Sequence, residues 1–424
     1  MHIHQLRLER FRGASSLSLV LDSRLNVFVG MNGAGKSSVL DATAILLSWL
    51  ANRVRHAGAS GRPIKELDIR NNESGAVLSL TVGTLSRDYG WSLAKSRKGR
   101  SQDERSSLGE VTNLAKILEK RINATNGEVD LPLLAYYPIN RAVLDIPLRI
   151  RSKHSFDVVS AYDDSLISGA SFRTFFEWFR EREDLENENL KYRDQLIRPD
   201  DFQFPDRQLE AVRQALEQFM PDFTNLTVRR NPLRMEVDKQ GQKLTVNQLS
   251  DGEKCLMAMV GDLARRFAIA NPMRGNPLEG QGVVLIDEID LHLHPKWQRM
   301  VVPRLLEVFP NCQFLISTHS PHVITHVQPE NLFLLQLREG QLSCSRPAES
   351  YGKTVERVLE DLMGIETTRP DEVNNSLRHI FELIDQRDFD DARVSIEQLE
   401  QEIGQDPELT KAGVLIKRKE LIGK

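Results

Sequence analysis

Cysteine is scarce in this sequence, and the few cysteines present lie far apart. The 424-residue chain holds three, Cys255, Cys312 and Cys344, and no two of them form a CxxC pair. An odd number at such spacing excludes a disulfide framework and a cysteine zinc site, and it suits a reducing compartment. A chain of this length can instead bury a large apolar core.

Long apolar runs are missing as well. The longest candidate, residues 42–50, is much shorter than the roughly 18 residues that a membrane-spanning helix requires. The amino-terminal segment MHIHQLRLERFRG has no apolar signal-peptide core. We therefore expect a cytoplasmic protein with no membrane contact of its own.

Neither sign of charge dominates. The 56 basic and 60 acidic side chains leave a net charge of −4, whereas a domain built to coat nucleic acid is usually basic. Residues 51–105 are a local exception, with 11 basic and 6 acidic side chains. Further basic residues follow at Arg141, Arg149, Arg151 and Lys153. This basic set either binds a phosphate backbone, or neutralises nearby acids and lines another site.

Apolar periodicity predicts a mixed head followed by a helical end. Strands and helices alternate over residues 1–164 and 223–350, and a helical insertion with one aromatic face separates them at 165–222. Residues 351–424 are expected to form a C-terminal helical appendage. The predicted fold class is therefore α/β, with a short helical insertion and an appended helical region.

Individual elements can be placed from the same patterns. Strands are predicted at residues 3–8, 17–21, 25–29, 76–82, 131–137 and within 226–237. Helices are predicted at residues 39–50, 108–121, 172–179, 210–219 and 255–268. The aromatic face of the insertion is expected to pack into a core. The segment 95–105 is expected to be an exposed loop.

The strongest local pattern is a Gly-rich loop that follows the predicted strand 25–29 and precedes a predicted helix. It matches GxxxxGK[ST], whose backbone N–H groups and helix N-terminus bind phosphate. Lys36 would reach the β- and γ-phosphates of ATP, and Ser37 would ligate Mg²⁺. The predicted nucleotide-binding residues of the loop are Gly30, Asn32, Gly33, Ala34, Gly35, Lys36, Ser37 and Ser38.

A second pattern is the apolar run 283–286, which ends in Asp287 and Glu288. Two acids at the end of a buried strand match the Walker B pattern. Asp287 would hold Mg²⁺ directly or through water, and Glu288 would orient the attacking water. We therefore predict that Glu288 is catalytic and that Asp287 shares the metal with the loop serine.

A third pattern, Leu249-Ser-Asp-Gly-Glu-Lys254, precedes a predicted helix. It resembles the signature of ATP-binding-cassette (ABC-type) ATPases, in which the serine and the glycine backbone contact the γ-phosphate held by another subunit. The resemblance implies nucleotide contacts for Ser250, Gly252 and Glu253. A serine before a helix is also a common N-cap, and the two roles are compatible.

Two further segments resemble the same family in the same order. Residues 289–295 (IDLHLHP) directly follow the Walker B acids, where the family has its D-loop. This position accounts for His292 and His294 better than a metal site does. The strand at 314–318 ends in His319, which matches the family's catalytic switch histidine.

Two features of the family are less complete in this sequence. Glu9-Arg-Phe-Arg12 resembles the phenylalanine-arginine corner of the recombination and repair branch, which implies that Arg12 lies near the nucleotide. No Q-loop glutamine follows the strand 131–137, because Tyr136-Tyr-Pro-Ile-Asn-Arg141 contains none. The corresponding ligand stays unassigned.

The lengths of two segments limit the branches of the ABC-type family to which this chain can be similar. Only 220 residues separate Gly30 from Ser250, which excludes the long coiled-coil arms of chromosome-structure ATPases. Only 79 residues follow Ser345, and their one DxD match, at Asp388 and Asp390, follows no predicted strand. We therefore expect no TOPRIM nuclease domain of the kind found in overcoming-lysogenization-defect nucleases.

The remaining match is to the ATPase of Septu-type anti-phage defence, including versions encoded with retrons. The resembling segments are FRGASSLSL, VGMNGAGKSSVLDA, HAGASGRPI, FFEWFREREDLENE, QLSDGEK, IDEIDLHLHPKWQ and STHSP. The resemblance implies a separate HNH effector nuclease as partner and, in retron versions, a reverse transcriptase with its RNA-linked DNA. The alternative is a RecF-like DNA repair ATPase. A transporter cassette is disfavoured, because the coupling segment and Q-loop are missing.

The sequence also gives expectations for the oligomeric state and for the C-terminal helices. A signature serine that acts on another subunit's nucleotide implies a head-to-tail homodimer or a higher oligomer. Residues 365–424 carry 14 acids and 9 bases, with apolar stripes around 377–384 and 394–399. We expect these stripes to pack on the ATPase core or to dock the effector nuclease.

Overall fold

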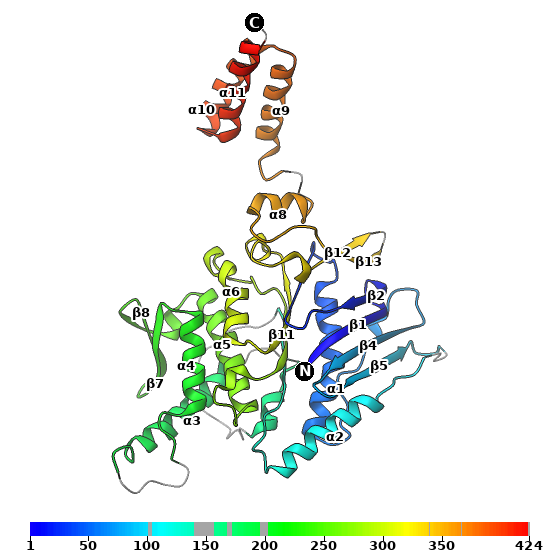
Figure 1. Ribbon diagram of the computed structural model, residues 1–424, viewed down its shortest axis with the longest axis vertical. Coiled ribbons are helices and arrows are strands. Elements are labelled where there is room, and N and C mark those ends of the chain that lie inside the picture. The colour runs from blue at the N-terminus through cyan, green and yellow to red at the C-terminus, as the bar shows by residue number, and fades with distance from the viewer. Residues whose placement is uncertain are drawn as a thin grey trace. The chain divides into compact units, whose positions relative to one another are not determined.

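The computed structural model divides the chain into two compact units, Met1–Lys353 and Thr354–Lys424 (Figure 1). Each unit has its own apolar core. No helix among the described residues is long and apolar enough to cross a membrane. The structure describes residues 1–100, 104–139, 157–167, 172–195, 202–338, 340–365 and 367–422.

A six-stranded sheet forms the centre of the first unit. In spatial order its strands are β13 (Gln341–Ser345), β12 (Leu332–Arg338), β3 (Leu25–Val29), β11 (Cys312–Thr318), β10 (Gly282–Ile286) and β6 (Leu133–Tyr137). The strands from β12 to β6 are parallel, and only the edge strand β13 runs antiparallel. Strands β3, β6, β10 and β11 are buried along their whole length, which is typical of a parallel sheet covered on both faces.

A second, antiparallel sheet lies beside the first. Its spatial order is β2 (Ala14–Val20), β1 (His2–Phe11), β4 (Gly75–Gly83) and β5 (Asp88–Ser96). The strand predictions at residues 3–8, 17–21 and 76–82 are confirmed. The expected loop at 95–105 is wrong for its first two residues, because β5 continues to Ser96 and pairs there with Gly75.

Helix α1 (Lys36–Arg55) contacts strands of both sheets. It touches β6, β10 and β11 of the central sheet, and β1, β4 and β5 of the antiparallel one. This position explains why most of its side chains are buried, whereas a surface helix would be buried along one apolar stripe only. Helix α2 (Gly109–Ala124) packs on α1 and β5.

The insertion joins the unit through helix α5 (Asp251–Ala270). Helices α3 (Phe172–Leu190) and α4 (Arg207–Phe219) both pack on α5. The aromatic face of α3 is fully buried, and the ring of Phe175 lies against the backbone of Gly261, so the stripe is core packing as expected. Arg213 on α4 donates to both carboxylate oxygens of Glu186 on α3, at 3.1 and 2.9 Å.

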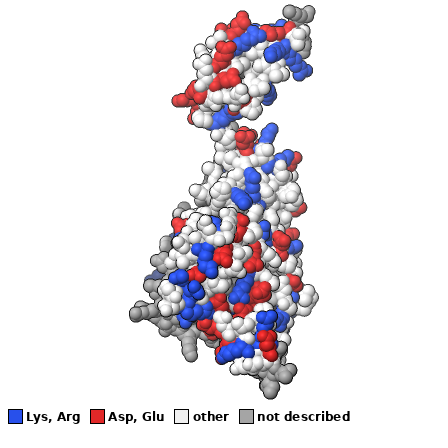
Figure 2. Space-filling view, turned by 90° about the vertical axis from the view of Figure 1, so that its left-hand side faces the viewer, with Lys and Arg blue, Asp and Glu red and all other residues white. Residues whose placement is uncertain are grey.

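A three-stranded antiparallel sheet completes the first unit on the side of the insertion. It consists of β7 (Phe223–Arg230), β8 (Leu233–Lys239) and β9 (Gln242–Thr245), which confirms the strands expected within 226–237. On this face Lys and Arg side chains lie beside Asp and Glu (Figure 2). Helices α6 (Pro295–Val308) and α7 (Pro321–Ile324) follow β10 and β11 in the chain and pack on each other.

The second unit is helical and buries its own apolar stripes. Helices α9 (Asp371–Asp385), α10 (Phe389–Ile403) and α11 (Pro407–Ile422) pack together around Leu377, Ile380 and Leu399, and the short α8 (Val355–Asp361) precedes them. These residues are buried inside the unit, with α11 as the third helix, so they do not need the ATPase core to cover them. Docking of the effector nuclease on this unit stays a prediction. The DxD match lies at the start of α10, where Asp388 is the N-cap.

Candidate nucleotide-binding site

Three of the predicted motifs meet at the carboxyl edge of the central sheet. Strand β3 leads into the Gly-rich loop, β10 into the two Walker B acids, and β11 into His319. The three strands are neighbours and run parallel, so their carboxyl ends lie at one edge. Ligands of open α/β sheets bind at this edge.

The Gly-rich loop passes directly into α1, which begins at Lys36. Gly35 is the N-cap with a φ of 87°, a left-handed conformation that favours glycine. The Lys36 ammonium donates to the carbonyl oxygens of Gly30 at 2.9 Å and Met31 at 3.1 Å. The loop also contains Asn32, Gly33 and Ala34, and the first turn of α1 contains Ser37 and Ser38.

The charge on Lys36 faces the acids that follow β10. Burial lowers the pKa of the Lys36 ammonium, and the carboxylates of Asp287, Glu288 and Asp290 oppose that shift. A lysine on α1 and the Walker B acids therefore lie within electrostatic reach of each other. Such a group of one cation and several anions matches the polyphosphate and its divalent cation that a nucleotide site must hold.

Ser317 on β11 fixes the two Walker B acids. Its hydroxyl donates to the Asp287 carboxylate, and it accepts a hydrogen bond of 2.8 Å from the backbone N–H of Glu288. The backbone N–H of Asp287 donates to the carbonyl oxygen of Tyr137 at 2.8 Å. Glu288 has a φ of 45°, which is rare for a residue with a long side chain. Sequence reasoning gave no role to Ser317 or Tyr137, although Ser317 begins the segment STHSP and Tyr137 lies in the segment searched for a Q-loop glutamine.

His319 lies beside the second Walker B acid. Its Nε2 atom is 3.9 Å from an Oε1 atom of Glu288, and its backbone N–H donates to Asp290 at 3.3 Å. Burial, followed by the charge of Lys36, lowers the pKa of His319 below its ordinary value of 6.5. The imidazole is therefore mostly neutral at pH 7 and can donate from one ring nitrogen and accept at the other.

The signature residues form the N-terminus of α5, which begins at Asp251 rather than at Cys255. Ser250 is the N-cap, and its hydroxyl accepts from the backbone N–H of Glu253 at 3.4 Å. The Glu253 carboxylate accepts in return from the backbone N–H of Ser250 at 3.0 Å. This capping box leaves the serine at the positive end of the helix dipole, where an anion is favoured.

Two lysines neutralise the acids of the signature. Lys239 on β8 lies 2.7 Å from Glu253, and Lys254 lies 2.9 Å from Asp251. Although burial opposes it, the hydrogen bond from Lys239 lowers the pKa of the Glu253 carboxyl below its ordinary value. Sequence reasoning missed Lys239, which is 14 residues away in the chain.

The signature helix touches the D-loop of the same chain. A Cβ atom on Gly252 would lie 2.2 Å from the carbonyl oxygen of His292, so only glycine fits there. Among the described residues, no hydrogen bond or ion pair joins the signature residues to the Gly-rich loop. His294 is the N-cap of α6 and accepts from the backbone N–H of Lys296 at 3.2 Å, which accounts for it without a metal.

Arg12 is held by two carboxylates. Its guanidinium donates to Asp41 on α1 at 2.8 Å and to Asp68 at 3.0 Å. Despite burial, these partners raise the pKa of Arg12. Tyr136 donates to the other oxygen of Asp41 at 2.9 Å. The predicted corner arginine is thus tied to the helix that follows the Gly-rich loop, through acids that no motif indicated.

Other predicted features lie elsewhere. The segment in which a Q-loop glutamine was sought ends at Asn140 and Arg141, which lie outside the described residues. Arg149, Arg151 and Lys153 lie outside them as well.

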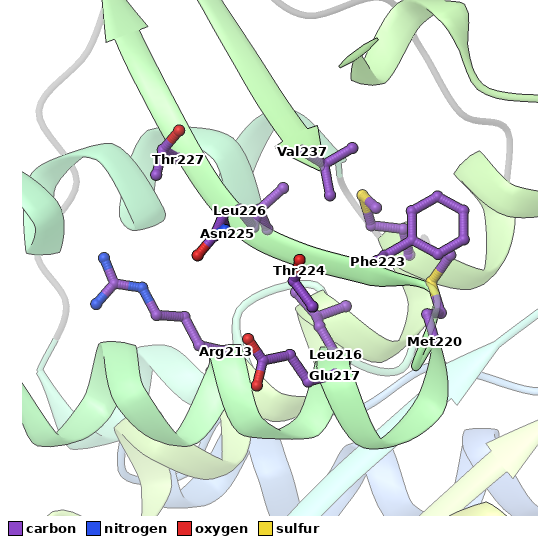
Figure 3. A pocket seen from close by; sticks show the side chains of 11 residues that line it. Arg213, Leu216, Glu217, Met220, Phe223, Thr224, Asn225, Leu226, Thr227 and Val237 are labelled. Atoms are coloured by element: carbon purple, nitrogen blue, oxygen red, sulfur yellow. The ribbon is translucent and has the colours of Figure 1, made fainter. Parts of the chain in front are cut away.

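A cavity of about 270 Å³ opens between α4, β7 and α5, but no residue of the nucleotide motifs lines it (Figure 3). Its wall includes Met257, two turns into the signature helix. This cavity is separate from the nucleotide site.

Gly252→Ala should disturb the contact between the signature helix and the D-loop. The added methyl group overlaps a backbone oxygen, which costs roughly 1–3 kcal/mol when a packed site cannot relax. Thermal unfolding of the first unit should therefore begin at a lower temperature. Gly109→Ala is the matched control, because nothing lies within 4 Å of its added Cβ atom. Equal melting temperatures for both variants would refute the tight contact.

The chain is similar to known proteins over most of its length. Residues 25–325 match the family described as "AAA domain, putative AbiEii toxin, Type IV TA system". The chain is 30% identical to the "Retron Ec83 probable ATPase" of Escherichia coli, over 96% of this chain and 85% of that protein. It is 30% identical to the "Retron Vc95 probable ATPase" of Vibrio cholerae, over 80% of this chain and 74% of that protein.

A third relative is named as a Septu protein and not as a retron protein. The "Septu protein PtuA" of Bacillus thuringiensis is 23% identical, over 87% of this chain and 85% of that protein. The matched family region begins at Leu25 and ends at Thr325, so it contains every motif from the Gly-rich loop to His319. The chain therefore belongs to the family of retron-associated and Septu ATPases and has an ABC-type ATPase head.

Proposed function

We propose that the chain binds ATP with Mg²⁺ at the carboxyl edge of the central sheet and hydrolyses it there. The observation that carries this proposal is that Lys36, the Walker B acids and His319 come together just beyond the carboxyl ends of three adjacent parallel strands. Phosphoryl transfer needs little covalent chemistry from the protein, so positions and charges decide the rate.

Each residue has a distinct proposed role. Lys36 and the N–H groups of the Gly-rich loop would hold the β- and γ-phosphates. Ser37 and Asp287 would supply oxygen ligands, which Mg²⁺ prefers, and the bond from Ser317 to Asp287 would orient that carboxylate. Glu288 would accept a hydrogen bond from the attacking water and so orient it. His319 would donate a hydrogen bond to the γ-phosphate.

A complete site would require a second copy of the chain. Ser250 and Gly252 form a helix N-terminus, with both nearby acids paired to lysines, so an approaching phosphate would meet little net negative charge. Within one chain, among the described residues, these groups contact the D-loop rather than the Gly-rich loop. This arrangement supports a head-to-tail homodimer in which each signature completes the partner's site.

At the level of the cell, we propose an anti-phage defence ATPase that holds and regulates a separate HNH effector nuclease. The support is the similarity to retron ATPases and to Septu PtuA over most of the chain. In the retron setting, a reverse transcriptase and its RNA-linked DNA would belong to the same complex. A RecF-like repair ATPase is the alternative, favoured by the motif order that the two classes share.

Lys36→Ala and Glu288→Gln should separate nucleotide binding from hydrolysis. Lys36→Ala removes the charge that faces the phosphates and should abolish ATP binding, measured by filter binding or calorimetry. Glu288→Gln keeps the shape of the side chain and should retain ATP binding while hydrolysis falls by about 10²-fold or more. Hydrolysis at the wild-type rate by Glu288→Gln would refute the role given to this carboxylate.

Mixed variants should reveal the shared site. Lys36→Ala and Ser250→Arg chains should each be inactive alone, and mixing them should restore hydrolysis, because one composite site per dimer is intact. Lys36→Ala mixed with Glu288→Gln is the matched control, since both changes affect the same side of the site and no intact site forms. Recovery in both mixtures, or in neither, would contradict the head-to-tail arrangement.

Purification of the native complex should identify the partners. Mass spectrometry and nucleic-acid sequencing of the purified complex should find an HNH nuclease, with retron DNA where a retron is encoded. Recombination or replication proteins in its place would favour the repair alternative.

A chain that ends at Lys353 should still bind ATP, because the second unit has a separate core. Loss of the nuclease from this shortened chain would assign its docking to Thr354–Lys424.

A further inference from the structure

A basic groove lies along helix α6 of the first unit and begins at Pro295, the last residue of the D-loop. The groove has a volume of about 710 Å³. Its charged lining residues are Lys296, Arg299, Arg304 and Glu307, and His326 contributes from the segment after α7. Three fixed positive charges and one negative charge therefore face a single concave surface in a chain whose net charge is −4.

The basic side chains of the groove are available to a ligand. Among the residues that the structure describes, Lys296, Arg299 and Arg304 form no ion pair, whereas Arg230 is bound to Glu183 and Asp184. Burial, followed by the charges of Arg299 and His326, lowers the pKa of the neighbouring His322. The groove thus has the excess positive potential that attracts an anion.

The spacing of the three charges suits an extended polyanion. From Lys296 to Arg304 the helix rises about 12 Å, and all three residues fall within one face of about 140°. No Phe, Tyr or Trp lines the groove, and its apolar lining consists of Pro295, Met300 and Pro303. Large aromatic residues are common anchors of a protein interface. A row of cations without such an anchor fits the phosphates of a nucleic-acid backbone better than an acidic protein surface.

The basic segment that sequence analysis singled out has other contacts. Arg53 donates to the carbonyl oxygen of Leu108, and Arg62 donates to that of Leu166. Arg97 donates to the carbonyl oxygens of Ile69 and Arg70. These three arginines are therefore engaged with backbone oxygens, and nucleic-acid binding by the rest of residues 51–105 stays a prediction.

The walls of the groove are direct continuations of the catalytic loops. Helix α6 begins where the D-loop ends, and α7 begins two residues after His319. Gln298 on α6 joins the two, because its amide donates to the carbonyl oxygen of Leu293 at 2.8 Å and accepts from Ser320 at 2.7 Å. A ligand that shifts α6 would therefore act on the D-loop and on the residue next to His319 together.

We propose that this groove binds the phosphate backbone of a nucleic acid and that Gln298 couples its occupancy to ATP hydrolysis. Recognition would depend on charge and not on base sequence, because phosphate contacts carry no sequence information. The groove would thus be a sensor on the ATPase head itself, with a lining separate from the Gly-rich loop, the Walker B acids and His319.

Charge reversal tests the binding step on the full-length chain. Lys296→Glu/Arg299→Glu/Arg304→Glu should weaken binding to a mixed-sequence DNA strand, its duplex or the matching RNA by about tenfold or more, measured by fluorescence anisotropy. The slope of log affinity against log salt should decrease by about two to three. A glutamine version of the same triple variant provides the test if the glutamate version does not fold.

The matched control places the same charge change on α2. Lys116→Glu/Lys120→Glu/Arg121→Glu alters three exposed basic residues that line neither of the cavities described above, and it should leave affinity unchanged. Equal affinity of the groove variant and the wild type would overturn the proposal, as would an equal loss in the control. Tighter groove-dependent binding of polyglutamate than of any nucleic acid would also overturn it, in favour of an acidic protein.

A substitution at Gln298 tests whether nucleic-acid binding is coupled to ATP hydrolysis. Nucleic acid should change the ATPase rate of the wild type, and Gln298→Met should bind the same nucleic acid without that change, because it loses the bonds to Leu293 and Ser320. An ATPase rate that responds equally in wild type, the groove variant and Gln298→Met would contradict the coupling. The comparison of DNA strand, duplex and RNA identifies which nucleic acid acts.

Discussion

The parallel pairing of β3, β11 and β10 is the constraint on which the candidate site depends. Val29 pairs with Thr318, and Ile286 pairs with Ile316. This register places the Gly-rich loop next to His319 and places Asp287 next to Ser317. A shift of one residue in β10 would turn Asp287 away from the serine, because successive side chains of a strand point to opposite faces. The strand register therefore sets the distances among the groups proposed to be catalytic.

Much of this arrangement could be predicted from the sequence, because it depends on local patterns. The apolar run Leu25–Val29 ends at the residue before the Gly-rich loop, and the strand has the same bounds in the structure. The pattern around Ser250 predicted a helix cap, and a capping box is present. Roles for the individual residues stay predictions, since geometry alone does not measure turnover.

The parts that sequence reasoning missed depend on long-range contacts. Ser317 lies 30 residues from Asp287, and Tyr136 lies 95 residues from Asp41, so no local pattern links either pair. The C-terminal stripes show the same limit. Their amphipathic spacing required a partner surface, but only the structure identifies α11 as that surface. The partners of Arg53 and Arg62 at 51–105 are likewise distant backbone oxygens, which composition cannot reveal.

The most direct test of the account is a structure of the Glu288→Gln variant with ATP and Mg²⁺. The account predicts a dimer in which the γ-phosphate lies between Lys36 and His319 of one chain and Ser250 of the other, with Mg²⁺ bound by Ser37 and Asp287. Nucleotide bound by one chain alone, with both signature helices facing solvent, would contradict it. So would nucleotide bound away from the carboxyl edge of the central sheet.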